Sequence, residues 1–450
     1  MKAVFAEGGL WRHLLSMTAA RSVGIMATFV VDFVDVLFIS RLGDTRLVAA
    51  VGFSAAALFF IRAIAIALGI ATTALVAQAV GSGNEQRAAR YAFNLSLLSF
   101  VLMTTIAATV WLGRGTVLSW VGASGETLHF ASGYLGIVLI GLPLLSLGNC
   151  GTATLFALGS ARLAMLVSLS ATLTQAALDP VFIFVLGWGL HGAALAAVCA
   201  QAVMAAVAWY CLLCRYRLRA PLAPHLLAAD IPAITAIAFP AMLTNLTSPI
   251  ATAYAARSMA QFGDAAASAF ALKDSDAVSS LGLVPLGFAL LFSLSAAVAP
   301  IVGQNAGAAR FDRVRETLYN ALVFNFAVTA IVCLLLFAAR DTLPGWFTLS
   351  GEAAALLRYF CSGIALLYGC KGMIFFMNAA YNNLGRPFYA TAANLACLTC
   401  GSLPLISLGG HYFGARGVIS GQMAEAVLVA PVCWLIVLRL TARRAAAQPR

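Results

Sequence analysis

Apolar stretches long enough to cross a lipid bilayer recur from one end of this chain to the other. A helix rises about 1.5 Å per residue, so roughly 20 apolar residues span a hydrocarbon core of about 30 Å. Hydrophobic residues make up 62% of the 450 residues and charged residues only 10%, which is incompatible with the polar surface of a soluble domain. Membrane barrels show short alternating segments instead. The sequence therefore predicts an all-α polytopic membrane protein.

Glycine, proline and charged clusters divide the chain into twelve predicted transmembrane helices. The first apolar stretch is too long for a signal-peptide core and lacks a small-residue cleavage pattern, so we expect it to be retained. An even number of helices places both termini on the same side of the membrane. The loops on that side carry most of the Lys and Arg residues found in loops, so both termini are expected in the cytoplasm. The predicted helices cover residues 14–39, 47–78, 88–112, 127–156, 161–186, 192–214, 231–258, 266–304, 317–339, 354–381, 388–408 and 417–439.

The chain also repeats itself at an offset of 226 residues. The matching pairs are Gln78 and Gln304, Gly81 and Gly307, Arg87 and Arg313, and Leu158-Gly159 and Leu384-Gly385. Such a duplication predicts two six-helix lobes, 1–219 and 220–450, related by a pseudo-twofold axis along the membrane normal. Two similar bundles around a central site suit alternating access. The helix at 266–304 is longer than its counterpart, and Pro285 is the expected place of a bend.

Two acidic residues lie at the same depth in the first half. Asp35 and Asp179 each precede by eight residues a glycine at the outer end of a predicted helix, which places both about 12 Å inside the boundary. A charge in the membrane costs about 2.5–3.5 kcal/mol on insertion scales, so each acid is a functional candidate. Asp32 lies on the same helix face as Asp35. Two carboxylates so close together favour the binding of a proton.

The surroundings of Asp179 also predict a cation site. Pro180 follows it directly and removes the helical hydrogen bond to the carbonyl of Ala176, while Gln175 lies one turn earlier on the same face. Carboxylate, amide and carbonyl oxygens together suit H⁺ or Na⁺ coupling. The alternative is that Asp179 only pairs with a neighbour to satisfy a buried charge.

Basic residues inside the membrane need partners. Arg62, near the middle of its helix, is expected to pair with Asp32, Asp35 or Asp179, either permanently or until a proton replaces it. In the second half, opposite charges either balance one another or indicate a substrate with an anionic group. These second-half residues are Lys273, Asp274, Asp276, Lys371 and Glu425.

Catalysis and cofactor binding are not indicated. The ten cysteines include two CxxC pairs, Cys211/Cys214 and Cys397/Cys400, but both lie in apolar runs without a nearby histidine, so we interpret them as packing residues. The five histidines are scattered near helix ends, with no nucleophile or metal motif. We therefore expect neither an enzyme nor a cofactor beyond the coupling ion, and the basic net charge reflects membrane topology rather than nucleic-acid binding.

Several motifs resemble the multidrug and toxic compound extrusion (MATE) family, in its DinF-like branch. They are residues 35–43 (DVLFISRLG), 76–81 (VAQAVG), 179–180 (DP), 191–196 (HGAALA) and 300–315 (PIVGQNAGAARFDRVR). The resemblance implies a V-shaped cavity between two lobes and export of organic, often cationic, compounds driven by H⁺ or Na⁺, with coupling acids at Asp35 and Asp179. The chain departs from the branch in three ways. The branch's proline in the first helix is missing, Gln175 stands where Asn is usual, and no clear Arg-Ile-Glu stretch is present.

The leading functional hypothesis is an antiporter that exports small cationic or amphiphilic compounds in exchange for H⁺ or Na⁺. Asp32 beside Asp35 favours H⁺. One alternative is a flippase for a lipid-linked precursor, which basic residues in the membrane would suit, namely Arg21, Arg62, Lys273 and Lys371. The other alternative is an exporter of an anionic metabolite. The duplication means that a monomer suffices, and the arginine-rich, lysine-poor composition suggests a GC-rich bacterium and hence its inner membrane.

Overall fold

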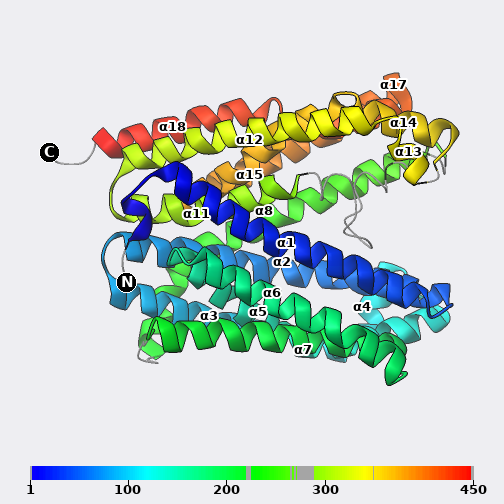
Figure 1. The fold of residues 1–450 in the computed structure, drawn as a ribbon, viewed down its shortest axis with the longest axis horizontal. Helices are drawn as coiled ribbons and strands as arrows, with labels where there is room; N and C mark the ends of the chain where they lie inside the picture. Colours follow the sequence, from blue (N-terminus) through cyan, green and yellow to red (C-terminus); the bar gives the residue numbers. More distant parts are fainter. Residues whose placement is uncertain are drawn as a thin grey trace. The chain divides into compact units, whose positions relative to one another are not determined.

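The computed structural model describes residues 3–218, 224–263, 266–267, 270, 288–347 and 349–446. This part of the chain is entirely helical apart from turns and short loops (Figure 1). Eleven segments of it are long and apolar enough to cross a membrane. The last of them, Pro387–Ala446, has 60 residues, about three times the length of one crossing. The prediction of an all-α, multi-pass membrane protein is confirmed.

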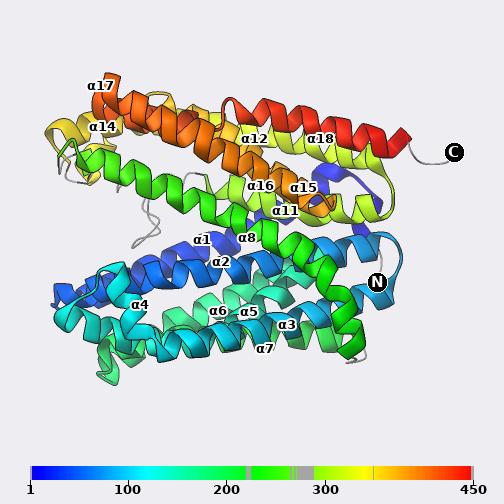
Figure 2. The same cartoon turned by 180° about the vertical axis from the view of Figure 1, so that it is seen from behind.

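The helices of the first half pack around α5. In Figures 1 and 2 this helix lies among α2, α3, α6 and α7, and it contacts all four. Leu135, Leu139 and Leu142 of α5 are buried in this packing. The elements of the first half are α1 (Leu10–Ser40), α2 (Thr45–Gly81), α3 (Glu85–Leu112), α4 (Arg114–Val121), α5 (Gly125–Ala157), α6 (Ala161–Pro180), the π-turn η2 (Val181–Val185), α7 (Gly189–Tyr210) and the π-turn η3 (Cys211–Arg215).

The helices of the second half pack around α15, which contacts α11, α12, α16 and α18. The described elements are α8 (Pro224–Ala260), α11 (Ala289–Gly307), α12 (Phe311–Ala339), α13 (Leu343–Trp346), α14 (Gly351–Cys361), the short 3-10 helix η4 (Ile364–Leu367), α15 (Tyr368–Asn383), α16 (Pro387–Ala396), the π-turn η5 (Cys397–Ser402), α17 (Leu403–Ala424) and α18 (Val429–Ala446).

The helix boundaries repeat with the period found in the sequence. α2 ends at Gly81 and α11 at Gly307, α3 begins at Glu85 and α12 at Phe311, and α6 and α16 begin at Ala161 and Pro387. Each pair is separated by 226 residues. The two halves therefore build the same helices from equivalent segments.

Two predicted helices of the second half are wrong in detail. The helix expected at 354–381 is interrupted between α14 and α15, where Gly363 adopts a φ of 127°. The boundary expected between residues 408 and 417 is present as a sharp kink at Gly414, with φ 60° and ψ −145°. The helix expected at 417–439 is instead interrupted by a turn at residues 425–428, which separates α17 from α18. Glycine makes these conformations accessible. Pro285, the expected bend, lies outside the described residues.

Contacts divide the chain into two compact units that exchange the beginnings of two helices. The main part of the first unit is Val23–Met242, whereas the second contains Phe5–Ser22 and most of the chain from Leu243 onward. The lobes predicted from the repeat, 1–219 and 220–450, do not include this exchange of helix starts. Residues 219 and 220, at the predicted boundary, lie outside the described part. The start of α1 thus packs in the second unit, and the start of α8 packs in the first.

Hydrogen bonds to the backbone hold the N-terminal segment in the second unit. The Phe5 N–H donates to Gln304 Oε1 at 3.0 Å, and the Phe5 carbonyl accepts from Asn305 Nδ2 at 3.2 Å and from Arg313 Nη2 at 3.0 Å. Arg313 Nη2 also donates to the Gly8 carbonyl at 2.9 Å. The Phe5 side chain is 1% exposed. The repeat motif at the end of α11 and the start of α12 therefore binds the segment that contains Phe5 and Gly8.

Removing the Arg313 side chain should release this segment. A hydrogen bond to a charged group makes a net contribution of about 1.5–3 kcal/mol to stability. Arg313→Ala should therefore raise the population of molecules in which the N-terminal segment is undocked, roughly ten- to a hundredfold. Limited trypsin digestion at Arg12, followed by mass spectrometry, measures this population. Arg315→Ala is the matched control, because Arg315 contacts Thr441 and Asp312 instead. Equal cleavage of both variants would show that Arg313 does not hold the segment.

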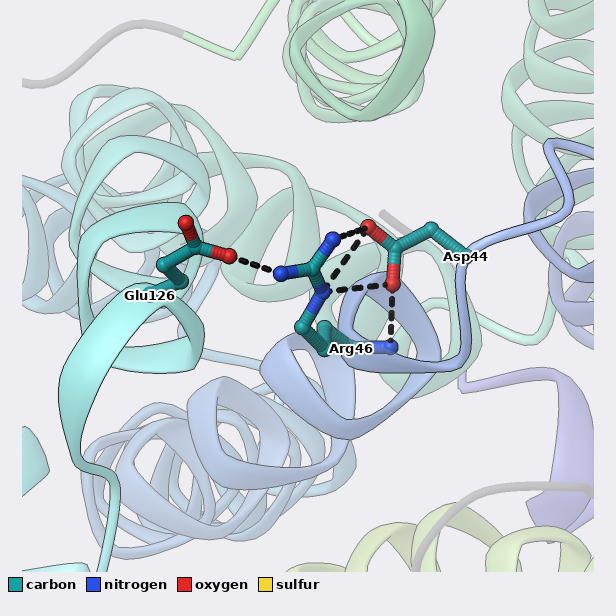
Figure 3. A network of polar contacts seen from close by, with 3 residues as sticks. All are labelled: Asp44, Arg46 and Glu126. Atoms are coloured by element: carbon teal, nitrogen blue, oxygen red, sulfur yellow. Dashed lines mark hydrogen bonds and ion pairs between the residues drawn. The ribbon is translucent and has the colours of Figure 1, made fainter.

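A polar network outside the membrane-spanning segments orders the corner between α1 and α2 (Figure 3). Asp44 caps α2 by accepting from the Arg46 N–H at 2.9 Å, and the Arg46 side chain donates back to Asp44 and also to Glu126 at the start of α5. The Arg46 side-chain hydrogen bond, followed by its backbone N–H, lowers the pKa of Asp44 below its usual value. The turn that follows α1, the helix that carries Asp35, is thereby tied to α2 and α5.

Candidate functional site

The structure brings together three of the predicted coupling residues of the first half. Asp35 lies on α1, and Gln175 and Asp179 lie one turn apart on α6. Gln175 Nε2 donates to Asp35 Oδ2. Asp35 and Asp179 lie close enough to each other to interact electrostatically. Two ionised carboxylates at such short range repel each other.

Asp179 is buried and, among the described residues, lacks hydrogen-bond donors. Asp179 is 0% exposed. In the described structure neither of its carboxylate oxygens accepts a hydrogen bond from a protein donor, and the same holds for Asp35 Oδ1. Burying a carboxylate without a compensating donor or cation is costly. Two bare anions are therefore an unfavourable state of this cluster.

Local chain geometry after Asp179 explains its position. Pro180 ends α6, and the chain continues as the π-turn η2, in which the Leu186 N–H donates to the Val181 carbonyl at 2.9 Å. Such turns are frequent at functional sites. A Cβ atom on Gly192 would lie 2.6 Å from the Phe182 carbonyl oxygen, so glycine is required there for α7 to pack against η2. The motifs at 179–180 and 191–196 thus form one structural unit.

Sequence reasoning missed Tyr134. This residue of α5 lies within electrostatic range of Arg62, Asp35, Asp179 and Asp32, and its ring is partly buried at the edge of the first-half core. Its hydroxyl group can both donate and accept. Tyr134 is the only tyrosine of α5. That a single tyrosine occurs in a largely apolar helix is the one sequence feature that could have identified it. A hydroxyl among acidic groups suits a proton-binding site.

Two other predicted residues of the first half lie at exposed positions. Asp32 is exposed on α1. Arg62 is exposed on α2, and within the described part of the chain it forms no salt bridge with Asp32, Asp35 or Asp179. The electrostatic proximity of Arg62 to Tyr134 is the observed arrangement in place of the expected ion pair.

In the second half the structure pairs two predicted charges. Lys371 Nζ on α15 contacts Glu425 Oε1, and Ser402 Oγ at the end of η5 donates to Glu425 Oε2. Ser402 was not predicted, because a serine in an apolar run carries no distinguishing signal. Lys273, Asp274 and Asp276 lie outside the described residues.

Comparison with known proteins places this chain among transporters. The MatE family model matches residues 22–181 and 240–406. The chain is 26% identical over 435 residues to the FAD transporter of Shewanella oneidensis, covering 95% of this chain and 94% of that protein. It is also 20% identical over 446 residues to the multidrug export protein MepA of Staphylococcus haemolyticus, covering 98% and 96%.

Solved structures match the fold. The Vibrio cholerae MATE transporter VcmN in its bent form has a TM-score of 0.90 at 23% identity, covering 97% of this chain and 98% of that one. A MOP superfamily transporter from Pyrococcus furiosus has a TM-score of 0.89 at 20% identity, covering 98% of each chain. Because the family model covers more than half of the chain, this protein belongs to the MatE family and is a multi-pass secondary transporter, not an enzyme.

Proposed function

We propose that this protein exports small organic compounds in exchange for H⁺ by alternating access. The Asp35–Gln175–Asp179 cluster carries this proposal, because it places two acidic side chains close together, with Gln175 of α6 donating to Asp35 of α1. Two acids that close cannot both stay ionised at low cost. Protonation from one side of the membrane and release to the other would drive the transport cycle.

The choice of H⁺ over Na⁺ rests on the surroundings of the two acids. Gln175 directs its N–H donor at Asp35, so the amide does not offer an oxygen there. A hard cation prefers several oxygen ligands, whereas a shared proton needs only the two carboxyl groups. Asp35 and Asp179 also match the coupling positions of the DinF-like branch, to which we assign the chain.

The substrate class follows from the relatives and from the charges in the membrane. A multidrug exporter among the relatives supports cationic or amphiphilic substrates. The FAD transporter supports a second candidate, export of an anionic metabolite, and the partly exposed Lys371 favours it. We place the protein in a bacterial inner membrane, with both termini in the cytoplasm.

Purified protein in liposomes tests the proposed function. Efflux of a fluorescent organic cation is followed under an imposed pH gradient, under a Na⁺ gradient, and under both. We expect transport that follows the pH gradient and is insensitive to Na⁺. A typical coupling free energy of about 1–3 kcal/mol should change the apparent substrate affinity roughly 5- to 150-fold between the two pH values. Transport that needs Na⁺ and ignores pH would refute the H⁺ assignment.

A further inference from the structure

The ion pair of the second half has the composition of an anion-binding site. Glu425 has both carboxylate oxygens occupied, one by the ammonium group of Lys371 and the other by the hydroxyl group of Ser402. An ammonium group carries three donor hydrogens, so a lysine can serve more than one acceptor. In this structure the anion that these two donors hold is the carboxylate of Glu425.

Close backbone packing holds the donors and Glu425 in place. A Cβ atom on Gly401 would lie 2.6 Å from the Glu425 carbonyl oxygen, and one on Gly421 would lie 2.4 Å from the Leu405 carbonyl oxygen. Ser402 is 0% exposed and ends the π-turn η5. Small residues allow this close approach of helices within membranes. Ser402 is therefore a preorganised donor, which loses little conformational entropy on binding.

The lysine is the accessible member of the pair. The Lys371 side chain is 15% exposed, against 4% for Glu425. Lys371, Phe375 and Asn378 share one partly exposed face of α15, whose neighbouring positions are buried. Phe375 stacks on Phe292 with the ring centroids 5.0 Å apart. Ionisable residues in transmembrane helices face a bundle interior or a water-filled space. A ligand that approaches this face meets aromatic surface and an ammonium group together.

Resting on the proposed function, we propose that Lys371 is an anion-binding residue for transported compounds and that Glu425 is its internal counterion. The anionic group of an aromatic substrate, a phosphate or a carboxylate, competes with Glu425 for the ammonium group of Lys371. The ring system of the substrate lies against the face of α15 that carries Phe375. Without such a substrate, Glu425 neutralises the lysine inside the membrane.

The alternative is a permanent structural ion pair. Breaking a buried pair by removing one partner destabilises a protein, whereas replacing both charges is often neutral. A structural pair would therefore change stability in the single variants and leave ligand selectivity unchanged. The two explanations differ in their prediction for binding of a charged ligand relative to an uncharged one.

Riboflavin and riboflavin 5′-phosphate provide a matched pair of fluorescent probes. They share one aromatic ring system, and only the second carries a phosphate group. Fluorescence quenching by purified protein in detergent measures both dissociation constants. Removing the competing carboxylate in Glu425→Gln should tighten binding of the phosphate form about tenfold or more, which corresponds to about 1.4 kcal/mol, and should leave riboflavin binding unchanged. The double variant Lys371→Gln/Glu425→Gln should lose this preference, and Lys371→Arg/Glu425→Gln should keep it.

Asp230→Asn is the control for loss of a buried ion pair. Asp230 is likewise held at both oxygens, by Arg90 at 2.9 Å and by Asn94 at 2.7 Å, but near the start of α8. This variant should keep the wild-type ratio of the two dissociation constants. Equal ratios in the wild type, Glu425→Gln and the double variant, or no measurable binding of the phosphate form to Glu425→Gln, would overturn the anion site. If H⁺-driven efflux by the wild type is intact in that case, the proposed function stands. If that efflux is absent but the predicted preference is found, only the proposed function fails.

Discussion

Asp179→Asn and Asp35→Asn should each reduce efflux driven by a pH gradient to the level of protein-free liposomes. An amide cannot take up the proton that the two carboxyl groups are proposed to share. Asp179→Asn should also fold as well as the wild type or better, because it removes a buried carboxylate that has no donor in the described structure. Loss of transport with retained stability is the combination expected of a coupling residue.

The measurement pairs a transport assay with thermal unfolding of the same preparations. Asp312→Asn is the matched control, since the Asp312 side chain is 96% exposed, and it should transport like the wild type. Normal H⁺-driven efflux by Asp179→Asn would contradict the proposed site. Loss of transport accompanied by a large loss of stability would indicate that Asp179 has a structural role instead.

Gly417→Ala adds one methyl group, and it should destabilise the protein more than the other glycine-to-alanine substitution proposed below. A Cβ atom on Gly417 would lie 1.8 Å from the Gly409 carbonyl oxygen, on the other side of the kink at Gly414. Both contacting groups belong to the backbone, so no side-chain rotation relieves the overlap. Overpacking that shifts the backbone costs about 1–3 kcal/mol or more, and we expect a lowered melting temperature and a reduced yield of monodisperse protein.

Gly69→Ala is the matched control for the added methyl group. Gly69 lies inside α2, and a Cβ atom there would have no neighbour within 4 Å. Alanine is favoured over glycine inside a helix by about 0.5–1 kcal/mol. This variant should therefore unfold at the same or a slightly higher temperature than the wild type. Similar melting temperatures for the two variants would show that the segments around Gly414 can separate without cost.

The pairing of charges illustrates where sequence reasoning reaches its limit. Arg62 was expected to pair with an acid of the first half, yet it forms no such salt bridge in the described structure, whereas Lys371 pairs with Glu425. Residue spacing predicts the depth of a side chain in a helix. It does not predict the rotation of that helix against its neighbours, and this rotation decides which side chains meet.

The membrane location, the helical class and the duplication could all be predicted from the amino-acid sequence. Long apolar segments leave the backbone no polar partner except its own helical hydrogen bonds, and the offset of 226 residues recurs in the helix boundaries. Only the tertiary structure showed that Tyr134 lies within electrostatic range of the acidic cluster, that Ser402 binds Glu425, and that the N-terminal segment packs in the second unit. These features depend on contacts between residues far apart in the chain. Such contacts are set by the packing of whole helices, and no local pattern encodes them.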